Sequence, residues 1–402
     1  MLTLEQLRKD TNFAKERLAH KHFKDIHFID EVISLDDKRK LIKSYLDDFL
    51  AQRNAISKEI GVMIKNGNKA AAEQQKLKIA DIKENADKLE IELAELESAI
   101  YDRLVTMPNF PNAIVPAGRA AEDNEITYSV SSFPSLPPNA LAHWDLAKKF
   151  DLIDFDLGNK ITGAGFPVYK GKGAALQRAL ITFFLDKAIE AGYLEVQVPH
   201  VVNKDSGFGT GQLPDKEGQM YHIGLDDLYL IPTAEVPITN LYRDVIVDEK
   251  NLPIKNVGYT PCFRREAGSY GKDVRGLNRL HQFDKVEIVR IEKPENSYPA
   301  LEEMLNHVEG LLKALELPYR ILALCGGDMS FASALTYDFE VYSAAQKRWL
   351  EVSSVSNFEL ISMATGCGIF NCLISSIADV KPSLFLAIPH LSHIIFPNFL
   401  WK

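Results

Sequence analysis

Mostly apolar positions recur at alternating intervals of four and three along the first hundred residues. One series runs from residue 35 to residue 63 and a second from 82 to 100, with Asn66-Gly67-Asn68 between them. Alternating spacing of this kind is the seam of a left-handed coiled coil, and Asn-Gly-Asn is a turn signal. We therefore expect an antiparallel helical hairpin, which at ~1.5 Å per residue projects roughly 40 Å. The seam positions are Leu35, Arg39, Ile42, Leu46, Phe49, Arg53, Ile56, Ile60 and Met63, then Ile82, Ala86, Leu89, Leu93, Leu96 and Ile100.

The turn end of this predicted hairpin is basic. Residues 58–78 contain five lysines against two acidic residues, Glu59 and Glu73. Such a cluster at the end of a long helical arm favours contacts with the phosphate backbone of an RNA. Because the cluster lacks aromatic residues for base stacking, it would recognise the shape of the RNA and not its bases. A helical packing element or a dimerisation strut is the alternative. The candidate tRNA-binding residues are Lys58, Lys65, Lys69, Lys76 and Lys78.

Beyond the hairpin the pattern changes to a mixture of helices and strands. Pro, Asn and Gly cluster in MPNFPNAIVPAG from Met107, which predicts a linker over residues 105–120 between an arm at 1–104 and a body at 121–359. In the body we expect helices over 173–191 and 298–315. We expect strands over 193–199, 257–263, 281–291, 319–324, 337–342 and 349–359.

Composition is that of a soluble globular protein. The 402 residues are 46% hydrophobic and 25% charged, with a formal net charge of −9, and are long enough for two domains. This charge argues against a generally basic nucleic-acid coat, so any RNA contact needs a local patch. Four cysteines without CxxC spacing suggest neither a disulfide framework nor a zinc site. The N-terminal MLTLEQLRKD lacks the apolar core of a signal peptide, so we expect a cytoplasmic protein.

The 28-residue run from Thr260 to Glu287 carries the densest chemistry. Two apolar-alternating segments enclose a glycine-rich loop, so we expect antiparallel strands that present Arg264, Glu266 and Glu287 beneath a mobile loop. A fixed guanidinium suits phosphate because its planar fork donates two parallel hydrogen bonds, and a carboxylate suits an amino group. An ion-paired surface hairpin is the alternative. The loop residues concerned are Gly268, Gly271, Lys272, Arg275, Gly276 and Arg279.

A second candidate for ligand binding is Thr233-Ala234-Glu235, which follows the apolar run LYLIP and would stand at a strand end. Glu235 and Glu287 could accept hydrogen bonds from an ammonium or hydroxyl group, and Thr233 would supply a small polar wall. Selection of a hydroxyl depends on buried partners that are left unpaired without it. A helix N-cap at Thr233 is the plainer interpretation.

Three runs resemble the class II aminoacyl-tRNA synthetases, and in particular the seryl-tRNA synthetases. Thr260–Glu287 resembles motif 2, the helix–glycine–strand–proline segment ending at Pro199 resembles motif 1, and Glu351-Val352-Ser353-Ser354 matches a strand of the seryl family. The resemblance implies an α+β fold, with an antiparallel coiled-coil arm and a class II catalytic domain on an antiparallel sheet. It also implies a homodimer formed through the strand that ends at Pro199, and an arm that reaches the tRNA.

The resemblance implies a reaction as well. L-Serine and ATP form seryl-adenylate, and the seryl group moves to tRNA(Ser), with tRNA(Sec) as an additional acceptor. Arg264 would meet the α-phosphate, Glu266 the adenine amino group, and Glu351 with Ser354 would hold Mg²⁺. The implied catalytic residues are Arg264, Glu266 and Glu287, and the implied serine-binding residues are Thr233, Ala234, Glu235 and Glu287. The implied ATP-binding residues are Arg264, Arg265, Glu266, Phe283, Glu351, Val352, Ser353 and Ser354.

The resemblance stops after residue 359. Residues 360–402 contain no arginine and three charged residues, and they lack the family's Asn-Gly-Ser run and its motif 3 helix with an ATP-binding arginine. The uncharged stretch Leu360–Ala378 is long enough for a membrane span, but its seven Ser, Thr, Gly or Asn residues argue against one. We favour a C-terminus replaced by a shifted reading frame. We expect severely reduced activity and a body destabilised by missing sheet strands.

Two other functions stay open from the sequence. A non-catalytic RNA-binding relic would keep the arm and lose the chemistry, and the missing motif 3 arginine favours it for this chain. A coiled-coil scaffold without a ligand would leave the charged run at 264–287 unexplained. The favoured function is a serine–tRNA ligase that uses ATP and Mg²⁺, binds tRNA(Ser), forms a homodimer and does not enter a membrane.

Overall fold

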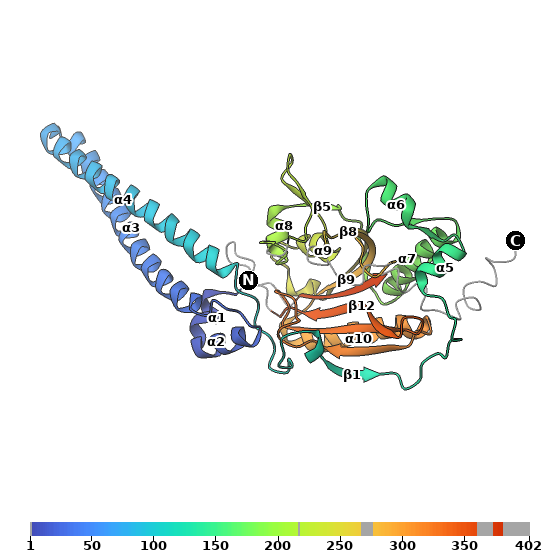
Figure 1. Ribbon diagram of the computed structural model, residues 1–402. Coiled ribbons are helices and arrows are strands. Elements are labelled where there is room, and N and C mark those ends of the chain that lie inside the picture. The colour runs from blue at the N-terminus through green and yellow to red at the C-terminus, as the bar shows by residue number, and fades with distance from the viewer. Residues whose placement is uncertain (1, 216–217, 267–275, 360–372, 381–402) are drawn as a thin grey trace. The chain divides into compact units, whose positions relative to one another are not determined.

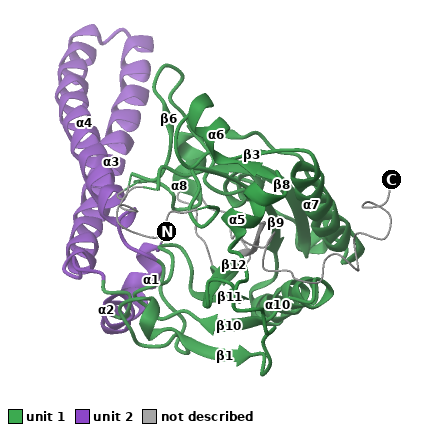
Figure 2. Cartoon of the chain, turned by 45° about the vertical axis from the view of Figure 1, so that its right-hand side comes forward, with its two compact units in different colours: residues 1, 20–22, 109–402 green, residues 2–19, 23–108 purple. Residues whose placement is uncertain are grey.

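The chain forms two compact units (Figure 2). One comprises residues 2–19 and 23–108, and the other is formed by residues 20–22 with the chain from Asn109 onward. The computed structural model describes residues 2–215, 218–266 and 276–359, and the backbone of 373–380.

The first unit is the helical arm. Helices α3 (Phe28–Lys65) and α4 (Lys69–Leu104) lie side by side (Figure 1), and the predicted Asn66-Gly67-Asn68 turn joins them. Gly67 has a φ of 80°, and the Asn68 side chain accepts a hydrogen bond from the Ala71 N–H. Two short helices, α1 (Leu4–Lys9) and α2 (Thr11–His20), precede them. The predicted helical hairpin is therefore confirmed. Its buried seam residues are Ile42, Leu46, Ile60, Ile82, Ala86 and Ile100.

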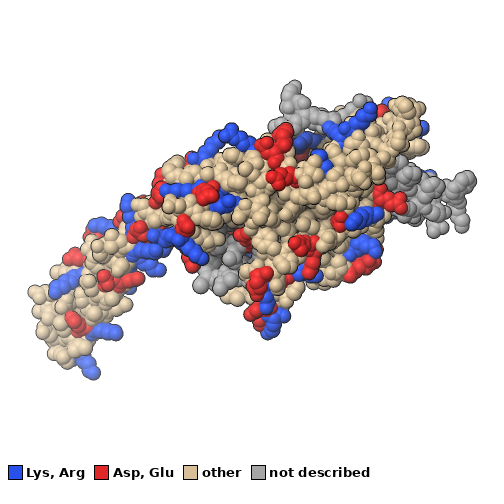
Figure 3. All heavy atoms as spheres, turned by 90° about the horizontal axis from the view of Figure 1, so that it is seen from below, with Lys and Arg blue, Asp and Glu red and all other residues tan. Residues whose placement is uncertain are grey.

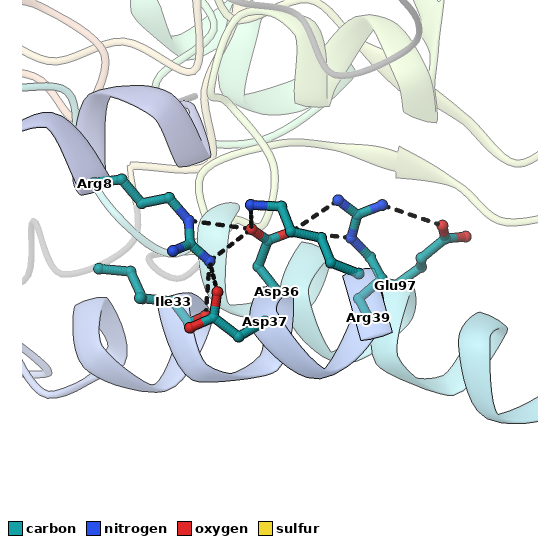
Figure 4. A network of polar contacts seen from close by, with 7 residues as sticks. Arg8, Ile33, Asp36, Asp37, Arg39 and Glu97 are labelled. Carbon is teal, nitrogen blue, oxygen red and sulfur yellow. Dashed lines mark hydrogen bonds and ion pairs between the residues drawn. The ribbon is translucent and has the colours of Figure 1, made fainter. Parts of the chain in front are cut away.

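A buried carboxylate ties the base of the arm together (Figure 4). The Asp36 side chain on α3 is 1% exposed and accepts hydrogen bonds from Arg8 of α1 and from Arg39, each at 2.7 Å. The Lys40 ammonium lies 2.8 Å from it. Burial alone would raise the pKa of Asp36, but hydrogen bonds from Lys40, Arg39 and Arg8 outweigh it and lower the pKa to about 2. Arg39 can thus occupy a seam position because Asp36 neutralises its charge.

The second unit is built on a sheet of eight described strands in the order β1-β10-β11-β12-β13-β9-β8-β4. Figure 1 labels β1, β12, β9 and β8 of this sheet. Neighbouring strands run antiparallel, apart from the parallel pair of β4 with β8. The expected α+β fold is confirmed. The strands are β1 (Glu125–Ser129), β4 (Leu194–Glu195), β8 (Ile254–Phe263), β9 (Gln282–Ile291), β10 (Tyr319–Ala323), β11 (Leu335–Ser343), β12 (Arg348–Asn357) and β13 (Leu373–Val380).

Helices α7 (Lys172–Glu190) and α10 (Ser297–Ala314) bury their apolar side chains against the sheet. Val286 and Ile288 of β9 pack into this core. Successive side chains of a strand point to opposite faces, so Phe283, Lys285 and Glu287 lie on the other face. The smaller elements are β2 (Ile153–Asp154), β3 (Val168–Tyr169), β5 (Val201–Asn203), β6 (His222–Ile223), β7 (Leu228–Leu230), α5 (His143–Lys149), α6 (Phe155–Ile161), α8 (Lys204–Gly209), α9 (Glu235–Asn240) and the 3₁₀ turns η1 (Ala121–Asp123), η2 (Glu249–Asn251) and η3 (Pro294–Asn296).

The strand predicted over 193–199 is shorter than expected and spans only Leu194–Glu195. The Val196 N–H still donates to the Val257 carbonyl oxygen at 2.8 Å. Val198 then packs into a separate apolar cluster with Ala234 and Ile238, and Pro199 has no N–H to donate to a ladder. The alternating sequence pattern therefore continues beyond the hydrogen-bonded strand.

The tail contributes a strand to the sheet, which corrects the expectation that sheet strands are missing. β13 lies between β12 and β9 and pairs with both. The last six residues of the uncharged stretch 360–378 are in this strand. Among the described residues no helix has the length and apolar character that a membrane span requires. Residues 360–372 and 381–402, with Cys367, Cys372, Lys381 and Lys402, lie outside the described residues.

A three-residue segment from the N-terminal region belongs to the second unit. The Lys21 ammonium donates hydrogen bonds to the carbonyl oxygens of Ser330 at 2.8 Å, Phe331 at 3.3 Å and Ser333 at 2.6 Å. Burial lowers the pKa of Lys21 to about 7, while the three carbonyl dipoles favour the charged form. On either side, His20 Nε2 lies 3.0 Å from the Val115 carbonyl oxygen and His22 Nε2 lies 2.7 Å from that of Gly118.

Candidate functional site

Arg264 is fixed directly beyond the end of β8. Its N–H donates to the His281 carbonyl oxygen at 2.9 Å, which extends the β8–β9 hairpin by one rung. Its Nε donates to the Pro232 carbonyl oxygen at 3.3 Å, and its guanidinium lies 5.0 Å from the centre of the Phe283 ring. A guanidinium stacked on a ring is pre-organised for planar recognition of a phosphate.

Glu266 is held in the left-handed region, with a φ of 50°. Its side chain is 14% exposed and accepts a hydrogen bond from Arg279 at 2.9 Å. The neighbouring Arg265 is exposed, and its guanidinium lies 6.0 Å from the centre of the Tyr221 ring. Arg264 and Arg265 therefore contact different rings. The predicted loop residues Gly268, Gly271, Lys272 and Arg275 lie outside the described residues.

Three buried polar side chains meet at the base of the site. Lys285 and Glu287 on β9 are both 0% exposed, and Thr233 is 4% exposed. The Thr233 hydroxyl donates to Glu287 Oε2 at 3.1 Å, and Lys285 Nζ donates to Thr233 Oγ1 at 3.1 Å. Lys285 Nζ and Glu287 Oε2 are 3.8 Å apart. Sequence reasoning missed Lys285, although its two-residue spacing from Phe283 and Glu287 on a strand places it on the same face.

The Thr233-Ala234-Glu235 segment connects a strand to a helix. It follows β7, which ends at Leu230, and leads into α9, which begins at Glu235. The Thr233 hydroxyl accepts a hydrogen bond from the Glu235 N–H at 3.3 Å, but the N-cap residue of α9 is Ala234, so the N-cap expected at Thr233 lies one residue later. Ala234 and Glu235 are buried, at 0% and 7% exposure.

A β-bulge brings Glu351 and Ser354 to one face of β12. In a regular strand, residues three apart point to opposite faces. Here Glu351 pairs with Glu340 and Ser354 with Asp338, because the register shifts by one residue between them. Glu340 and Asp338 are two residues apart on β11, so their partners share a face. Val352 and Ser353 are 3% and 2% exposed; Val352 packs into the apolar core, and Ser353 pairs with the core residue Phe339.

The strand register places the β12 pair on the same face as Glu287. Ser354 pairs with Ile377 of β13, Ile377 pairs with Glu287 of β9, and Glu287 pairs with Gly258 of β8. Two strand spacings of ~4.8 Å separate Ser354 from Glu287 by about 10 Å. At Gly258 an added Cβ would lie 2.9 Å from the Val196 carbonyl oxygen, so glycine permits the close approach of this neighbouring segment.

Not every charged residue of the central hairpin belongs to this face. Asp284 alternates with Phe283 and Lys285 and accepts hydrogen bonds from the Tyr259 hydroxyl and from Gln177 of α7. Burial raises the pKa of Asp284, although these two hydrogen bonds oppose the rise. Asp284 is therefore half-buried between the sheet and α7, on the other side from the site.

The five candidate lysines of the arm are all exposed. Lys76 forms an ion pair with Glu73 at 2.6 Å. On the face of the arm seen in Figure 3, basic and acidic side chains are interspersed. Exposed apolar side chains accompany the lysines: Val62, Ile64 and Leu77 are 59%, 53% and 70% exposed.

Two family models match the chain. The model described as "Seryl-tRNA synthetase N-terminal domain" matches residues 1–111, and "tRNA synthetase class II core domain (G, H, P, S and T)" matches residues 221–365. A serine–tRNA ligase of Salinibacter ruber is 48% identical over 359 residues, which cover 89% of this chain and 84% of the relative. One of Chlorobaculum parvum is 46% identical over 362 residues, with the same coverages.

Solved structures agree with these relatives. The seryl-tRNA synthetase of Pyrococcus horikoshii, complexed with ATP, has a TM-score of 0.87 and 29% identity, over 96% of this chain and 93% of its own. The cytoplasmic serine–tRNA ligase of Naegleria fowleri, in complex with AMP, has a TM-score of 0.81 and 25% identity, over 96% and 92%. The chain therefore belongs to the seryl-tRNA synthetase family, the class II aminoacyl-tRNA synthetases that act as serine–tRNA ligases.

Proposed function

We propose that the β8–β9–β12 face binds ATP and L-serine, and that the arm grips tRNA(Ser). The observation that carries the proposal is the shared face of Arg264, Glu287 and Ser354, assembled from three strands. It brings a phosphate-binding guanidinium, a buried carboxylate and a hard oxygen donor onto one face, with Ser354 and Glu287 in one cross-strand row and Arg264 further along the β8–β9 hairpin.

The chemistry needs positioning rather than a protein nucleophile. A serine carboxylate oxygen attacks the α-phosphorus of ATP, and pyrophosphate leaves. A ribose hydroxyl of the tRNA then attacks the seryl carbonyl carbon, and AMP leaves. Arg264 would neutralise charge that develops on the α-phosphate, and Phe283 supports its guanidinium. Glu266 would accept a hydrogen bond from the adenine amino group, which requires it to share or release Arg279.

Glu351 and Ser354 fit a magnesium ion. The bulge gives them one face, and carboxylate and hydroxyl oxygens are donors that Mg²⁺ accepts beside phosphates and water. The ion would supply charge neutralisation at the phosphates. The described residues contain no cluster of three or more His, Cys, Asp or Glu side chains arranged for a metal.

The serine pocket is proposed at Thr233, Ala234, Glu235 and Glu287. Two buried carboxylates suit a ligand that brings an ammonium and a hydroxyl, since both groups donate hydrogen bonds. An amino acid without the hydroxyl would leave a buried acceptor without a donor, which costs binding free energy.

Two exposed surfaces suggest binding partners, the lysines of the arm and the sheet edge at β4. The exposed lysines of the arm would contact the tRNA backbone. We propose a homodimer through the sheet edge at β4, where Leu194 is 66% exposed and Ile189 of α7 is 45% exposed. We also propose that the protein works in the cytoplasm, and use of tRNA(Sec) stays a prediction.

A second candidate function concerns this chain's own tail. Residues 360–402 bring no arginine, so the clamp on ATP that the resemblance implies from motif 3 has no counterpart there. β13 supplies a backbone ladder but places Ile377 in register between Ser354 and Glu287. We infer weakened adenylate formation, and a chain that binds tRNA without activating serine is the alternative.

Serine-dependent ATP–pyrophosphate exchange on the 402-residue chain tests the proposal. We expect slow exchange that Arg264→Ala abolishes and that Arg178→Ala, which removes an arginine from α7 outside the proposed face, leaves unchanged. A folded chain that binds tRNA(Ser) without any exchange would support the second candidate. Exchange that survives Arg264→Ala would contradict the assigned site.

A further inference from the structure

Lys285 is a fully buried lysine at the base of the proposed serine pocket, and the proposed reaction does not use it. Its Nζ lies 3.1 Å from Thr233 Oγ1 and 3.8 Å from Glu287 Oε2. A lysine ammonium is expensive to bury, so a fully buried one is retained where its charge has a partner. Here the partner is the carboxylate that the proposed function gives to serine.

The three contacts of the Thr233 hydroxyl fix its direction. A lysine ammonium can only donate, and so can the Glu235 N–H, which is 3.3 Å from Thr233 Oγ1. These two donors occupy both acceptor positions of the hydroxyl. Its single proton therefore points to Glu287 Oε2, 3.1 Å away. The Thr233 hydroxyl is fully engaged by the protein and has no hydrogen bond left for a ligand.

The ammonium also sets the charge of Glu287. A carboxylate with 0% exposure takes up a proton readily unless a positive charge lies close to it. Protonated Glu287 would present a donor to the ligand, whereas ionised Glu287 presents only acceptors. A serine ammonium and hydroxyl are donors, so the pocket suits them only while Glu287 stays ionised.

We propose that Lys285 is a positioning residue for serine binding: it keeps Glu287 an ionised acceptor and turns the Thr233 hydroxyl toward Glu287 and away from the ligand. This inference rests on the proposed serine site. It gives the Thr233 hydroxyl the role of a hydrogen-bond donor to Glu287. The direct contacts to serine then come from Glu287 and from the Glu235 region.

Charged groups on the neighbouring elements decide how the pocket responds to pH. Glu287 shares β9 with Lys285, Glu235 begins α9, and Arg264 follows β8. On β13 the register partner of Lys285 is Asp379. Of the described side chains, Glu287 and Glu235 are acidic and Lys285 and Arg264 are basic, so removal of the buried ammonium leaves an excess of negative charge.

A double-mutant cycle tests the inference on the full chain. Lys285→Met, Glu287→Gln and the double variant are compared with the unaltered chain, by calorimetric titration of L-serine and of a non-hydrolysable seryl-adenylate analogue at about pH 6 and about pH 8.5. Lys21→Met, which removes a half-buried lysine that lies outside the proposed pocket, is the control. Circular dichroism checks that each variant is folded.

The inference predicts that Lys285→Met weakens ligand binding about tenfold or more at the lower pH, and that binding recovers partly at the higher pH, because a higher pH favours the ionised form of any carboxylate. In the Glu287→Gln background the same change should not weaken binding, because the residue through which Lys285 acts has lost its charge. Lys21→Met should bind as the unaltered chain does.

Three results would overturn it. One is an equal loss of affinity from Lys285→Met in both backgrounds at both pH values, which a purely structural role would give. Another is binding by Lys285→Met that matches the unaltered chain. If Lys285→Met does not fold, the affinity of the double variant is compared with that of Glu287→Gln. Weaker ligand binding by the double variant would contradict the inference. Failure of the unaltered chain to bind either ligand would instead overturn the proposed function, and this inference with it.

Discussion

Two contacts within the protein fix the Arg264 side chain, a hydrogen bond and a stacked aromatic ring. The Pro232 carbonyl oxygen accepts from its Nε at 3.3 Å, and the Phe283 ring centre lies 5.0 Å from its guanidinium. Both contacts use properties that lysine lacks, a planar fork and a weakly hydrated cation that stacks. We therefore expect the proposed site to depend on the shape of this side chain and not on its charge alone.

Arg264→Lys should consequently lower serine-dependent pyrophosphate exchange by a large part of the effect of Arg264→Ala. Removal of a preorganised group that stabilises transition-state charge costs about 3 kcal/mol, or roughly a hundredfold in rate. Initial exchange rates at saturating serine measure it. Exchange by the lysine variant equal to that of the unaltered chain would show that charge alone is sufficient.

Individual site residues differ in how readily the sequence predicts them. Arg264, Glu266 and Glu287 stand out as charges beside apolar strand positions, and the structure brings Arg264 and Glu287 to the hairpin expected for them. Lys285 was missed because a lysine within an alternating run is normally assigned to the exposed face, whereas its exposure is 0%. Only its counter-charge, which depends on three-dimensional contacts, makes burial tolerable.

At the scale of the elements, the base of the arm should respond to acid. The pKa of Asp36 is about 2 in the folded arm against 3.8 for an ordinary aspartate. A depressed pKa means that the stabilisation is complete above pH 3.8 and is lost as the pH falls through about 2. The difference corresponds to about 2 kcal/mol of unfolding free energy.

Asp36→Asn should therefore unfold at lower urea concentration than the unaltered chain at neutral pH, and the difference should shrink toward about pH 2. Helical circular dichroism during urea unfolding, at several pH values, measures it. Asp37→Asn is the matched control, since the Asp37 side chain is 62% exposed and also pairs with Arg8. An equal effect of the two substitutions would contradict a specific role of the buried carboxylate.

β13 should be protected by pairing on both sides. Its residue Ser376 is in register with Val355 of β12 and with Ile288 of β9. Ser376→Pro removes a ladder donor from the middle of the sheet, so we expect it to destabilise the second unit. Hydrogen exchange of residues 373–380, followed by mass spectrometry, measures the pairing directly. Exchange as fast as in an unstructured peptide would show that the tail does not complete the sheet.

Elements with a strong local pattern could be predicted from the sequence. The 4,3 spacing predicted the arm, and alternation predicted β8 and β9, because both depend on neighbours close in the chain. The bulge on β12 could not be read in this way, because a register shift is visible only against a partner strand. β13 was missed for a related reason: its run of apolar and serine residues acquires a defined register only between β12 and β9.

At the scale of the whole molecule, the net charge of −9 means that a grip on the tRNA backbone needs a local basic patch, and the arm end is the predicted one. Replacement of Lys58, Lys65, Lys69, Lys76 and Lys78 by Gln should weaken tRNA(Ser) binding and flatten its salt dependence, by about 1 in logarithmic slope for each phosphate that the arm no longer neutralises. Filter binding at several salt concentrations measures it. Lys313→Gln, on α10, is a control that removes one positive charge away from the arm. An unchanged slope would show that the arm lysines do not bind the tRNA.

Serine charging of tRNA(Ser) requires the proposed ATP site, the proposed serine site and the arm together. Because residues 360–402 contain no arginine, we expect turnover of the 402-residue chain to fall at least about a hundredfold below that of an intact relative. Serine charging of tRNA(Ser), with the Salinibacter ruber enzyme as reference, measures it. Equal turnover would mean that the tail or the remaining site replaces the absent clamp.

The insertion of Lys21 between the carbonyl oxygens of residues 330–333 has a consequence for synthesis of the chain. These partners are 309 positions apart, so at about 5–20 residues per second the ribosome delivers the carbonyls roughly 15–60 s after the lysine. The long helices of the arm are complete well before that time. Nascent chains stalled before residue 330 should therefore carry a folded arm whose Lys21 reacts with amine reagents, and chains stalled after the whole segment has emerged should protect it.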